Sequence, residues 1–311
     1  MKKVLITDDV HPLLTEGLTD AGYVCDFRPK IKLEEVRAIA GDYVGMIINS
    51  KILMDKQMLD KATQLKFVGR LGSGMEIINQ PYAAQKGVAV YNAPDGNCNA
   101  VGEQALGMLL ALANNLLRAD AEVRRKEWNR EANRGFELQG KKVGIIGFGY
   151  TGRSFAQKLA GMEVEILAYD KYKEHYADEY RYVEEVDLET LIEKSDIISF
   201  HLPLTPETHH YANAEFIKSC KSGVIFINTS RGHVIPTGLL VEALESGKVR
   251  GACLDVFENE KPQTFTKGEN TLFERLYQFP QVVLTPHIAG WTVESKKRLA
   301  EILLRKILTG K

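Results

Sequence analysis

The stretch from residue 141 to residue 170 constrains the fold more than any other part of this chain. Residues 143–146 form a short apolar run, which is typical of a strand buried on both faces. Glycines follow at positions 147, 149 and 152, in G-x-G-x-x-G spacing. A second apolar run ends in Asp170, about 18 residues after the last glycine and close to the roughly 20 expected for a dinucleotide-binding unit.

Each residue of this motif has a physical task. Gly147 permits the tight turn out of the strand, and Gly149 lets a pyrophosphate approach the backbone. Gly152 lets the following helix pack against the strand, while free N–H groups at the helix N-terminus face the phosphates. The Asp170 carboxylate would accept hydrogen bonds from ribose hydroxyls and repel a 2′-phosphate, which favours NAD over NADP. Glycine-rich turns are common by chance, but here the strand, the helix and the acid all fit.

Composition excludes several classes of protein. A chain of 311 residues favours two domains, and 44% hydrophobic residues suffice for two cores. The 40 basic and 41 acidic side chains nearly balance, which argues against a nucleic-acid or acidic-membrane partner. The four cysteines lie far apart and lack zinc spacing, so we expect free thiols, no metal site and a cytoplasmic location.

No targeting or membrane segment is expected. The N-terminus is charged again by residue 8, so it reads as a first strand and not as a signal peptide. The most apolar long run, residues 105–117, has about 13 residues and falls short of the ~20 needed to cross a bilayer.

The first 92 residues alternate short strands and helices, which predicts a parallel, doubly wound sheet. No glycine motif follows the first strand, so this part is not itself the dinucleotide site. A turn-rich link leads to a long helix at about 100–118 and to a charged segment at 124–139, whose simplest interpretation is a solvated arm. Expected strands lie at 4–7, 24–27, 46–49, 65–70, 88–91, 143–146, 165–169, 197–200, 224–228, 250–254 and 282–284. Expected helices lie at 11–21, 33–40, 55–61, after Pro81, after Gly152, and at 188–194, 214–219, 236–246 and 293–308.

The fold class that follows is α/β, with two doubly wound parallel-sheet domains. Because the glycine motif lies in mid-chain, the C-terminal helix completes the first domain and the cofactor domain is inserted. We expect a flavodoxin-like substrate domain at 1–96 plus 290–311. The inserted Rossmann domain would span 97–289 and include a dimerisation helix and arm at about 97–139.

Polar side chains follow three predicted strands at their carboxyl ends, where open α/β sheets bind ligands. Arg231 follows the strand at 224–228 and can grip a carboxylate with two hydrogen bonds. His287 follows the strand at 282–284 and can exchange a proton with a carbonyl or hydroxyl oxygen. Glu260, after the strand at 250–254, would orient the imidazole and raise its pKa. The set suits the reduction of a keto acid.

Singly, each of these residues has an ordinary interpretation as an ion pair, a loop residue or a solvated charge. Their joint placement at three strand ends supports the chemical one. His209 and His210 lie in a polar loop with no third ligand spaced for a metal, so we interpret them as loop residues.

The chain resembles the D-isomer-specific 2-hydroxyacid dehydrogenases over essentially its whole length. The resemblance rests on the glycine motif, on His-Leu-Pro-Leu-Thr from residue 201 and on Asn-Thr-Ser-Arg-Gly from residue 228. It rests also on Gly-Ala-Cys-Leu-Asp-Val-Phe from residue 251 and Thr-Pro-His-Ile-Ala-Gly from residue 285.

The resemblance implies roles for individual residues. The family's catalytic Arg, Glu and His fall on Arg231, Glu260 and His287. The Gly72-Ser73-Gly74 loop matches the one whose N–H groups hold the substrate carboxylate. These enzymes are typically homodimers joined through the long helix and the arm around Trp128, which replaces the interpretation of a merely solvated arm. Further cofactor contacts fall on Tyr150, Thr151, Leu202, Thr229, Ser230, Asp255 and the loop from His287 to Gly290.

Within the family, the chain looks most like the D-3-phosphoglycerate dehydrogenases, which make 3-phosphohydroxypyruvate for serine synthesis. Lys51 and Arg130 match basic residues that hold the substrate phosphate there, and Arg70 is a further candidate. Asn49 stands where the pattern usually has an arginine, and Lys261 interrupts the usual Glu-Pro. No carboxy-terminal regulatory domain follows the last helix, so serine feedback through it is not expected.

Two other interpretations stay open at this stage. A glyoxylate or hydroxypyruvate reductase, or a D-lactate-type enzyme, would not need Lys51 and Arg130. More remotely, members of the superfamily serve as NAD-sensing corepressors, which bind proteins through the same fold. The intact catalytic set favours an enzyme acting on a small hydroxy acid.

Overall fold

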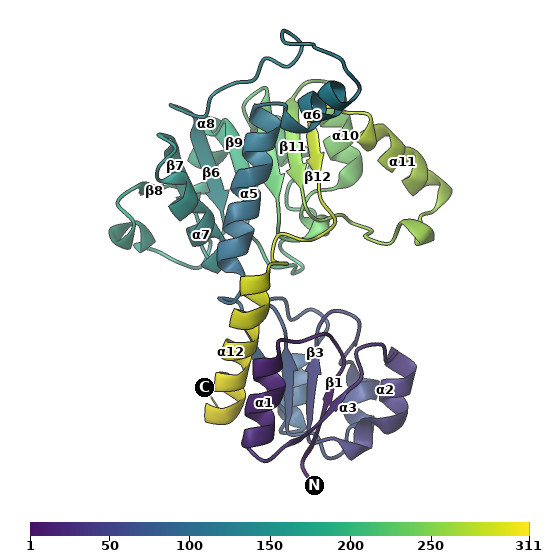
Figure 1. Ribbon diagram of the computed structural model, residues 1–311. Coiled ribbons are helices and arrows are strands. Elements are labelled where there is room, and N and C mark those ends of the chain that lie inside the picture. The colour runs from purple at the N-terminus through teal and green to yellow at the C-terminus, as the bar shows by residue number, and fades with distance from the viewer. Residues whose placement is uncertain (311) are drawn as a thin grey trace. The chain divides into compact units, whose positions relative to one another are not determined.

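A computed structural model describes residues 1–310 of the chain. The chain divides into two compact units (Figure 1). The smaller unit comprises Met1–Cys98 and the described residues from Trp291 onward, and the larger unit comprises Asn99–Gly290.

The smaller unit is built on a parallel sheet with strand order β2-β1-β3-β4-β5. Its strands are β1 (Lys3–Ile6), β2 (Val24–Phe27), β3 (Gly45–Ile48), β4 (Phe67–Arg70) and β5 (Ala89–Asn92). Its helices are α1 (Pro12–Asp20), α2 (Leu33–Ile39), α3 (Lys56–Lys61), α4 (Gln80–Gln85) and α12 (Val293–Thr309), with a 3-10 turn η1 (Ala40–Asp42).

Helix α12 joins this unit from the far end of the chain and lies beside α1 (Figure 1). The two helices approach so closely at Gly17 that a Cβ there would lie 2.2 Å from a methyl carbon of Leu304. Leu14 and Leu18 of α1 and Leu303 of α12 are fully buried in the same cluster. One face of the small sheet is thus covered by residues that are nearly 300 positions apart.

The larger unit is built on a second parallel sheet with strand order β12-β11-β10-β9-β6-β7-β8. Its strands are β6 (Lys142–Ile146), β7 (Glu165–Tyr169), β8 (Val183–Glu185), β9 (Ile197–Phe200), β10 (Val224–Asn228), β11 (Val249–Leu254) and β12 (Val282–Leu284). Its helices are α5 (Cys98–Ala113), α6 (Leu116–Arg124), α7 (Tyr150–Leu159), α8 (Leu188–Lys194), α9 (Ala214–Ser219), α10 (Thr237–Glu245) and α11 (Lys267–Tyr277), with 3-10 turns η2 (Tyr176–Glu179), η3 (Gly232–Val234) and η4 (Pro262–Thr264).

The strand order reverses at β6, which is the first strand of the larger sheet in sequence and lies between β7 and β9. Central strands such as β9 and β10 are buried along their whole length, as the continuous apolar runs predict. The two parallel sheets confirm the predicted α/β class with two doubly wound domains.

One predicted element is wrong in its extent. The long helix expected at about 100–118 is two helices, α5 and α6, because Asn115 adopts a left-handed backbone with a φ of 52°. Asparagine tolerates that conformation better than most residues, since its short polar side chain can bond locally. Strand β8 and helix α11 were not predicted.

Candidate active site

The carboxyl ends of three neighbouring strands carry the predicted chemical residues. Strands β10, β11 and β12 are adjacent and parallel, so the segments that follow them leave the same edge of the larger sheet. Arg231 follows β10, Asp255 and Glu260 follow β11, and His287 follows β12.

Asp255 anchors the segment after β12. Its carboxylate is fully buried and accepts three hydrogen bonds, from the Thr285 hydroxyl at 2.5 Å, the Ile288 N–H at 2.9 Å and the Ala289 N–H at 2.8 Å. The His287 N–H donates to the Asp255 carbonyl oxygen at 2.8 Å. These bonds hold His287 in a left-handed backbone conformation, with a φ of 55°, that a histidine rarely adopts.

His287 and Glu260 form a pair. Both carboxylate oxygens of Glu260 lie 2.9 Å from Nδ1 of His287. Burial raises the pKa of Glu260, but the hydrogen bond from His287 and the charges of His287 and Arg231 outweigh it and hold this pKa below the usual range. Glu260 therefore remains an anion that fixes the imidazole, and Nε2 of His287 is left to exchange a proton.

The Arg231 loop is shaped by a short polar network. Asn228 donates from its amide nitrogen to the Arg231 carbonyl oxygen at 2.9 Å, and its amide oxygen accepts from the N–H and the hydroxyl of Ser230. A guanidinium nitrogen of Arg231 donates to the Ser230 carbonyl at 2.7 Å. A Cβ at Gly232 would lie 1.9 Å from the Phe257 carbonyl, so only glycine lets this loop touch the segment after β11.

The glycine loop has the geometry that a dinucleotide needs. Gly147 has a φ of 92°, and a Cβ at Gly152 would lie 2.1 Å from the Gly147 carbonyl oxygen. No atom lies within 4 Å of a Cβ built on Gly149, and no side chain caps the N-terminus of α7. Open space and free helix N–H groups suit a pyrophosphate.

Two more polar groups fit the same ligand. Asp170 accepts hydrogen bonds from the N–H groups of Phe148 at 2.8 Å and Tyr172 at 3.0 Å, which ties the end of β7 to the glycine loop. A carboxylate offers about four acceptor sites, so capacity for ribose hydroxyls is left. The Thr229 hydroxyl is buried without a hydrogen-bond partner among the described residues. The residues present therefore fit NAD.

The basic residues predicted in the smaller unit are engaged within it. Lys51 donates to the Pro29 carbonyl at 2.5 Å and lies 3.6 Å from the Asp8 carboxylate. That same carboxylate accepts from the Asn49 N–H at 3.0 Å. Lys51 thus sits in a network anchored by Asp8.

Arg70 and the 72–74 loop are close neighbours. Arg70 donates to the Leu71 carbonyl at 2.9 Å, and its guanidinium occupies the place of a Gly72 side chain, since a Cβ there would lie 1.5 Å from a guanidinium nitrogen. Gly72 has a φ of 144°, and the Ser73 carbonyl accepts from the Asn92 amide at 2.9 Å. The loop is therefore held by side chains on both neighbouring strands, β4 and β5.

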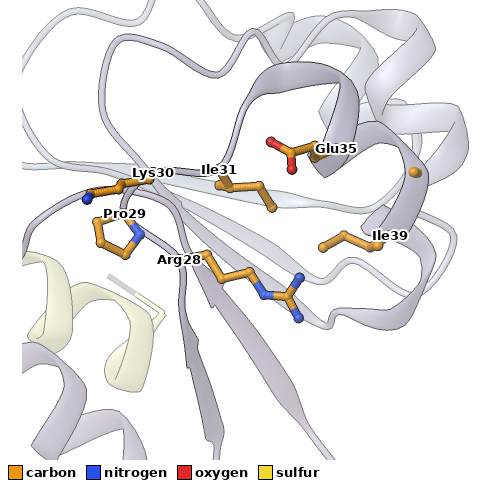
Figure 2. Close-up of a pocket in the computed structure, with 7 residues that line it drawn as sticks. Arg28, Pro29, Lys30, Ile31, Glu35 and Ile39 are labelled. Carbon is orange, nitrogen blue, oxygen red and sulfur yellow. The ribbon is translucent and has the colours of Figure 1, made fainter.

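A hollow in the smaller unit does not contain these residues. It has a volume of about 620 Å³, and Figure 2 shows the side chains around it. Its lining residues are Arg28, Pro29, Lys30, Ile31, Glu35, Ala38 and Ile39. No residue predicted to bind substrate lines it, so it is not the candidate site.

In the larger unit, Arg130 is exposed and borders a hollow of about 430 Å³ together with Trp128. The Trp128 side chain is 77% exposed, which is unusual for so large an apolar group.

The structure adds a third histidine to the neighbouring pair His209 and His210. The sequence places no third ligand near His209 and His210, but the structure brings His233 to them, with one ring nitrogen of each within 4.8 Å of the others. The expectation of no metal site rests on sequence spacing alone and stays untested by this grouping. His233 lies more than 20 positions away, and no spacing rule along the chain could have linked the three.

Comparison with known proteins agrees with this architecture. Residues 106–289 match the family model described as the D-isomer specific 2-hydroxyacid dehydrogenase, NAD binding domain. The hydroxypyruvate reductase of Thermotoga maritima is 36% identical over 89% of this chain and 88% of its own length. The chain belongs to the D-isomer specific 2-hydroxyacid dehydrogenases. The matched model is that of the family's NAD-binding domain, which confirms NAD as the cofactor.

Other relatives carry different names. The D-3-phosphoglycerate dehydrogenase of Methanocaldococcus jannaschii is 34% identical over all of this chain, which spans 58% of that protein. The chain thus spans little more than half the length of the phosphoglycerate dehydrogenases it matches. The D-lactate dehydrogenase of Aquifex aeolicus, solved with NAD and lactic acid, has a TM-score of 0.86 and 27% identity over 99% of this chain and 96% of its own.

Among residues 1–310, no helix combines the length and apolar character needed to cross a membrane.

Proposed function

We propose that this protein is an NAD-dependent dehydrogenase that interconverts a D-2-hydroxy acid and its 2-keto acid. The observation that carries the proposal is the His287–Glu260 pair, at 2.9 Å, beside the positive charge of Arg231. A proton-transfer group and a carboxylate-binding group on one sheet edge are what this reaction requires.

The residues divide the work of oxidation between them. Arg231 binds the substrate carboxylate and orients C2. Nε2 of His287 takes the proton of the C2 hydroxyl while the C2 hydrogen leaves as hydride and the carbonyl forms. NAD, when bound, supplies the hydride acceptor. Glu260 stabilises the imidazolium that results, because a nearby anion favours the charged form. Reduction runs the same steps backwards.

We propose 3-phosphoglycerate as the substrate. Lys51 and Arg70 would bind its acidic groups with the 72–74 loop, and Arg130 would add a second charge for the phosphate. The chain's likeness to phosphoglycerate dehydrogenases over its whole length supports this choice.

A second candidate is the reduction of hydroxypyruvate or glyoxylate. Asn49 carries no charge, and the Asp8 carboxylate near Lys51 offsets part of its charge. Both features weaken a phosphate site. The hydroxypyruvate reductase of Thermotoga maritima, matched over nearly its full length, supports this alternative.

A substrate panel tests both. Purified protein is assayed for NADH formation with 3-phosphoglycerate, D-glycerate and D-lactate at alkaline pH with the keto product trapped. NADH consumption is then followed with hydroxypyruvate and glyoxylate. A preference for 3-phosphoglycerate that is lost in a Lys51→Ala, Arg130→Ala double variant supports the first candidate. Preference for the unphosphorylated acids in both proteins supports the second.

His287→Ala tests the chemistry common to both. It should reduce turnover on every substrate by about 10²- to 10⁴-fold, the range typical for loss of a general acid–base group. NADH binding, followed by fluorescence, should be retained. Near-normal turnover in this variant would overturn the proposal.

We also propose a homodimer formed through α5, α6 and the arm. The exposed apolar side chains on this part of the chain support it, because exposed apolar patches often mark protein interfaces. They are Leu116, Leu117, Val123 and Trp128. Light scattering should give about twice the chain mass of 34.8 kDa, and Trp128→Ser should shift the mass toward one chain.

A further inference from the structure

A group of three histidines lies in the larger unit and takes no part in the proposed reaction. His209 and His210 belong to the loop between β9 and α9, and His233 belongs to η3, just after β10. The His210 N–H donates to the His233 carbonyl at 2.7 Å, and the Ala212 N–H donates to the Val234 carbonyl at 3.0 Å. Backbone pairing therefore fixes the two segments side by side.

The three imidazole rings lie close together. The ring centroids of His209 and His210 are 4.0 Å apart, and those of His209 and His233 are 5.3 Å apart. One ring nitrogen from each residue lies within 4.8 Å of the others. Nitrogens bound to one zinc ion at about 2.0–2.1 Å lie roughly 3.4 Å apart, so small side-chain rotations would complete the site.

The Glu258 carboxylate contacts two of the three histidine rings. Glu258 lies 2.9 Å from Nε2 of His210 and 3.7 Å from Nδ1 of His233. Its other oxygen accepts from the Thr237 N–H at the start of α10, at 2.7 Å. An anion that orients metal-binding imidazoles is the usual outer partner of such sites.

Two further observations suit a ligand. Nδ1 of His233 is buried without a hydrogen-bond partner among residues 1–310, so this polar atom is not satisfied by the protein alone. His210 is held in a left-handed backbone with a φ of 54°, a conformation that needs support from its surroundings. His209 is exposed, which leaves a route for an ion to enter.

We propose that His209, His210 and His233 bind one divalent transition-metal ion of the zinc class, with Glu258 as the carboxylate that orients them. Three imidazoles suit Zn²⁺, Co²⁺, Ni²⁺ or Cu²⁺, whereas Mg²⁺ and Ca²⁺ prefer oxygen ligands. The His287–Glu260 pair offers only two metal ligands, against three in the histidine group, and is assigned to the proposed reaction.

The site lies close in sequence to the residues of the proposed reaction, so a bound ion would affect the segments that carry them. His233 lies two residues after Arg231, and Glu258 lies two residues before Glu260. A bound ion would therefore join the loop after β9 to the loop after β10, and through Glu258 it would also hold the segment after β11, close to both chemical residues. This inference does not depend on the proposed reaction.

Metal binding to the full chain, with any affinity tag removed, tests the proposal. Protein stripped with a chelator and desalted is dialysed against Co²⁺ or Zn²⁺, and the bound metal is quantified. The variants are His210→Asn and His233→Asn. His175→Asn is the matched control, because His175 is exposed and also has a positive φ, of 60°, that asparagine tolerates. Circular dichroism and NADH binding establish that each variant is folded.

The expected result is one ion per chain in the native protein and in His175→Asn. Loss of an outer partner alone typically weakens metal binding about 10- to 100-fold, so His210→Asn and His233→Asn should weaken it by at least tenfold. The Tm should rise with Co²⁺ in the native protein and not in these two variants. His209→Asn, at an exposed position, gives a second test should either variant fail to fold.

Two results would overturn the proposal. One is native protein that binds no ion at concentrations up to the millimolar range. The other is undiminished binding in folded His209→Asn, His210→Asn or His233→Asn, which would put the ion elsewhere, for example at His287.

Discussion

Replacing Gly232 with alanine should force apart the two segments that carry Arg231 and Glu260. A Cβ at this position would lie 1.9 Å from both the carbonyl carbon and the carbonyl oxygen of Phe257, and 2.6 Å from the Glu258 nitrogen. These are backbone atoms, which cannot rotate out of the way as a flexible side chain could. One of the two segments must therefore move.

The size of the effect follows from these distances. Carbon atoms in contact lie about 3.5 Å apart, so the segments must separate by roughly 1.6 Å. Forcing extra volume into a packed site costs about 1–3 kcal/mol. The larger unit, residues 99–290, has 192 residues, and each kcal/mol shifts the Tm of such a unit by roughly 2–4 °C, so the Tm should fall by about 2–12 °C. A displacement of about 1 Å at Arg231 should also lower kcat/KM by roughly 100-fold.

Gly238→Ala is the matched control. Gly238 lies in α10, and no atom lies within 4 Å of a Cβ built there. Alanine should stabilise the helix by about 0.4–1 kcal/mol and leave kcat/KM unchanged. Calorimetry and steady-state kinetics on the three proteins check both quantities. If Gly232→Ala matched the native protein in Tm and in kcat/KM, the tight contact between the two segments would be refuted.

Three further predictions concern single groups. Glu260→Gln should lower kcat/KM by about 100-fold or more. Because the pKa of Glu260 is lowered in the fold, the ionised Glu260 supports His287 fully above the ordinary glutamate pKa. This support disappears as the pH falls through the lowered pKa. The pH–rate profile of the variant should therefore lack the fall in rate on the acid side that Glu260 causes. Asp255→Asn should lower the free energy of unfolding in urea by about 1–3 kcal/mol, since three hydrogen-bond donors lose a buried ionic acceptor. An unchanged midpoint of urea unfolding would contradict this prediction. Burial raises the pKa of Cys220 to about 12 and also raises that of Cys253. A thiol reagent at pH 8 should therefore label neither cysteine until the protein unfolds. Rapid labelling of more than two of the four cysteines in the folded protein would contradict this prediction.

Much of the fold could be read from local patterns. Strands β7, β9 and β10 have the predicted bounds, because strands buried on both faces are mostly apolar, although Ser199 lies inside β9. Helix α3 starts after Asp55, whose side chain accepts from the Met58 N–H as an acidic cap should.

The missed helix α11 also had a local signal. Thr266 and Glu269 form a capping box, with each side chain bonded to the other's backbone N–H, and the buried Phe273 and Leu276 follow. That spacing is a known mark of a helix start. The signal for the break at Asn115 was weaker, because asparagine is found at helix ends but also within helices, and the packing around it decides its backbone conformation.

The candidate site could be predicted from the sequence only in part, for a different reason. Arg231, Glu260 and His287 could be singled out because each follows a strand whose end is visible in sequence. What could not be read are contacts between distant segments, such as Gly232 against Phe257 and His233 beside His209 and His210. These depend on how two loops meet at the sheet edge, which no single stretch encodes.

The return of α12 to the smaller unit has a consequence for biosynthesis. When residue 98 has left the ribosome, the face of α1 that carries Leu14 and Leu18 lacks the partner that buries it, since Leu303 is not yet translated. The 192 residues of the larger unit come first, which at about 5–20 residues per second takes roughly 10–40 s. During this interval the nascent smaller unit exposes an apolar surface to the cell's chaperones and proteases. Ribosomes that stall within the larger unit would therefore release fragments with an uncovered first sheet.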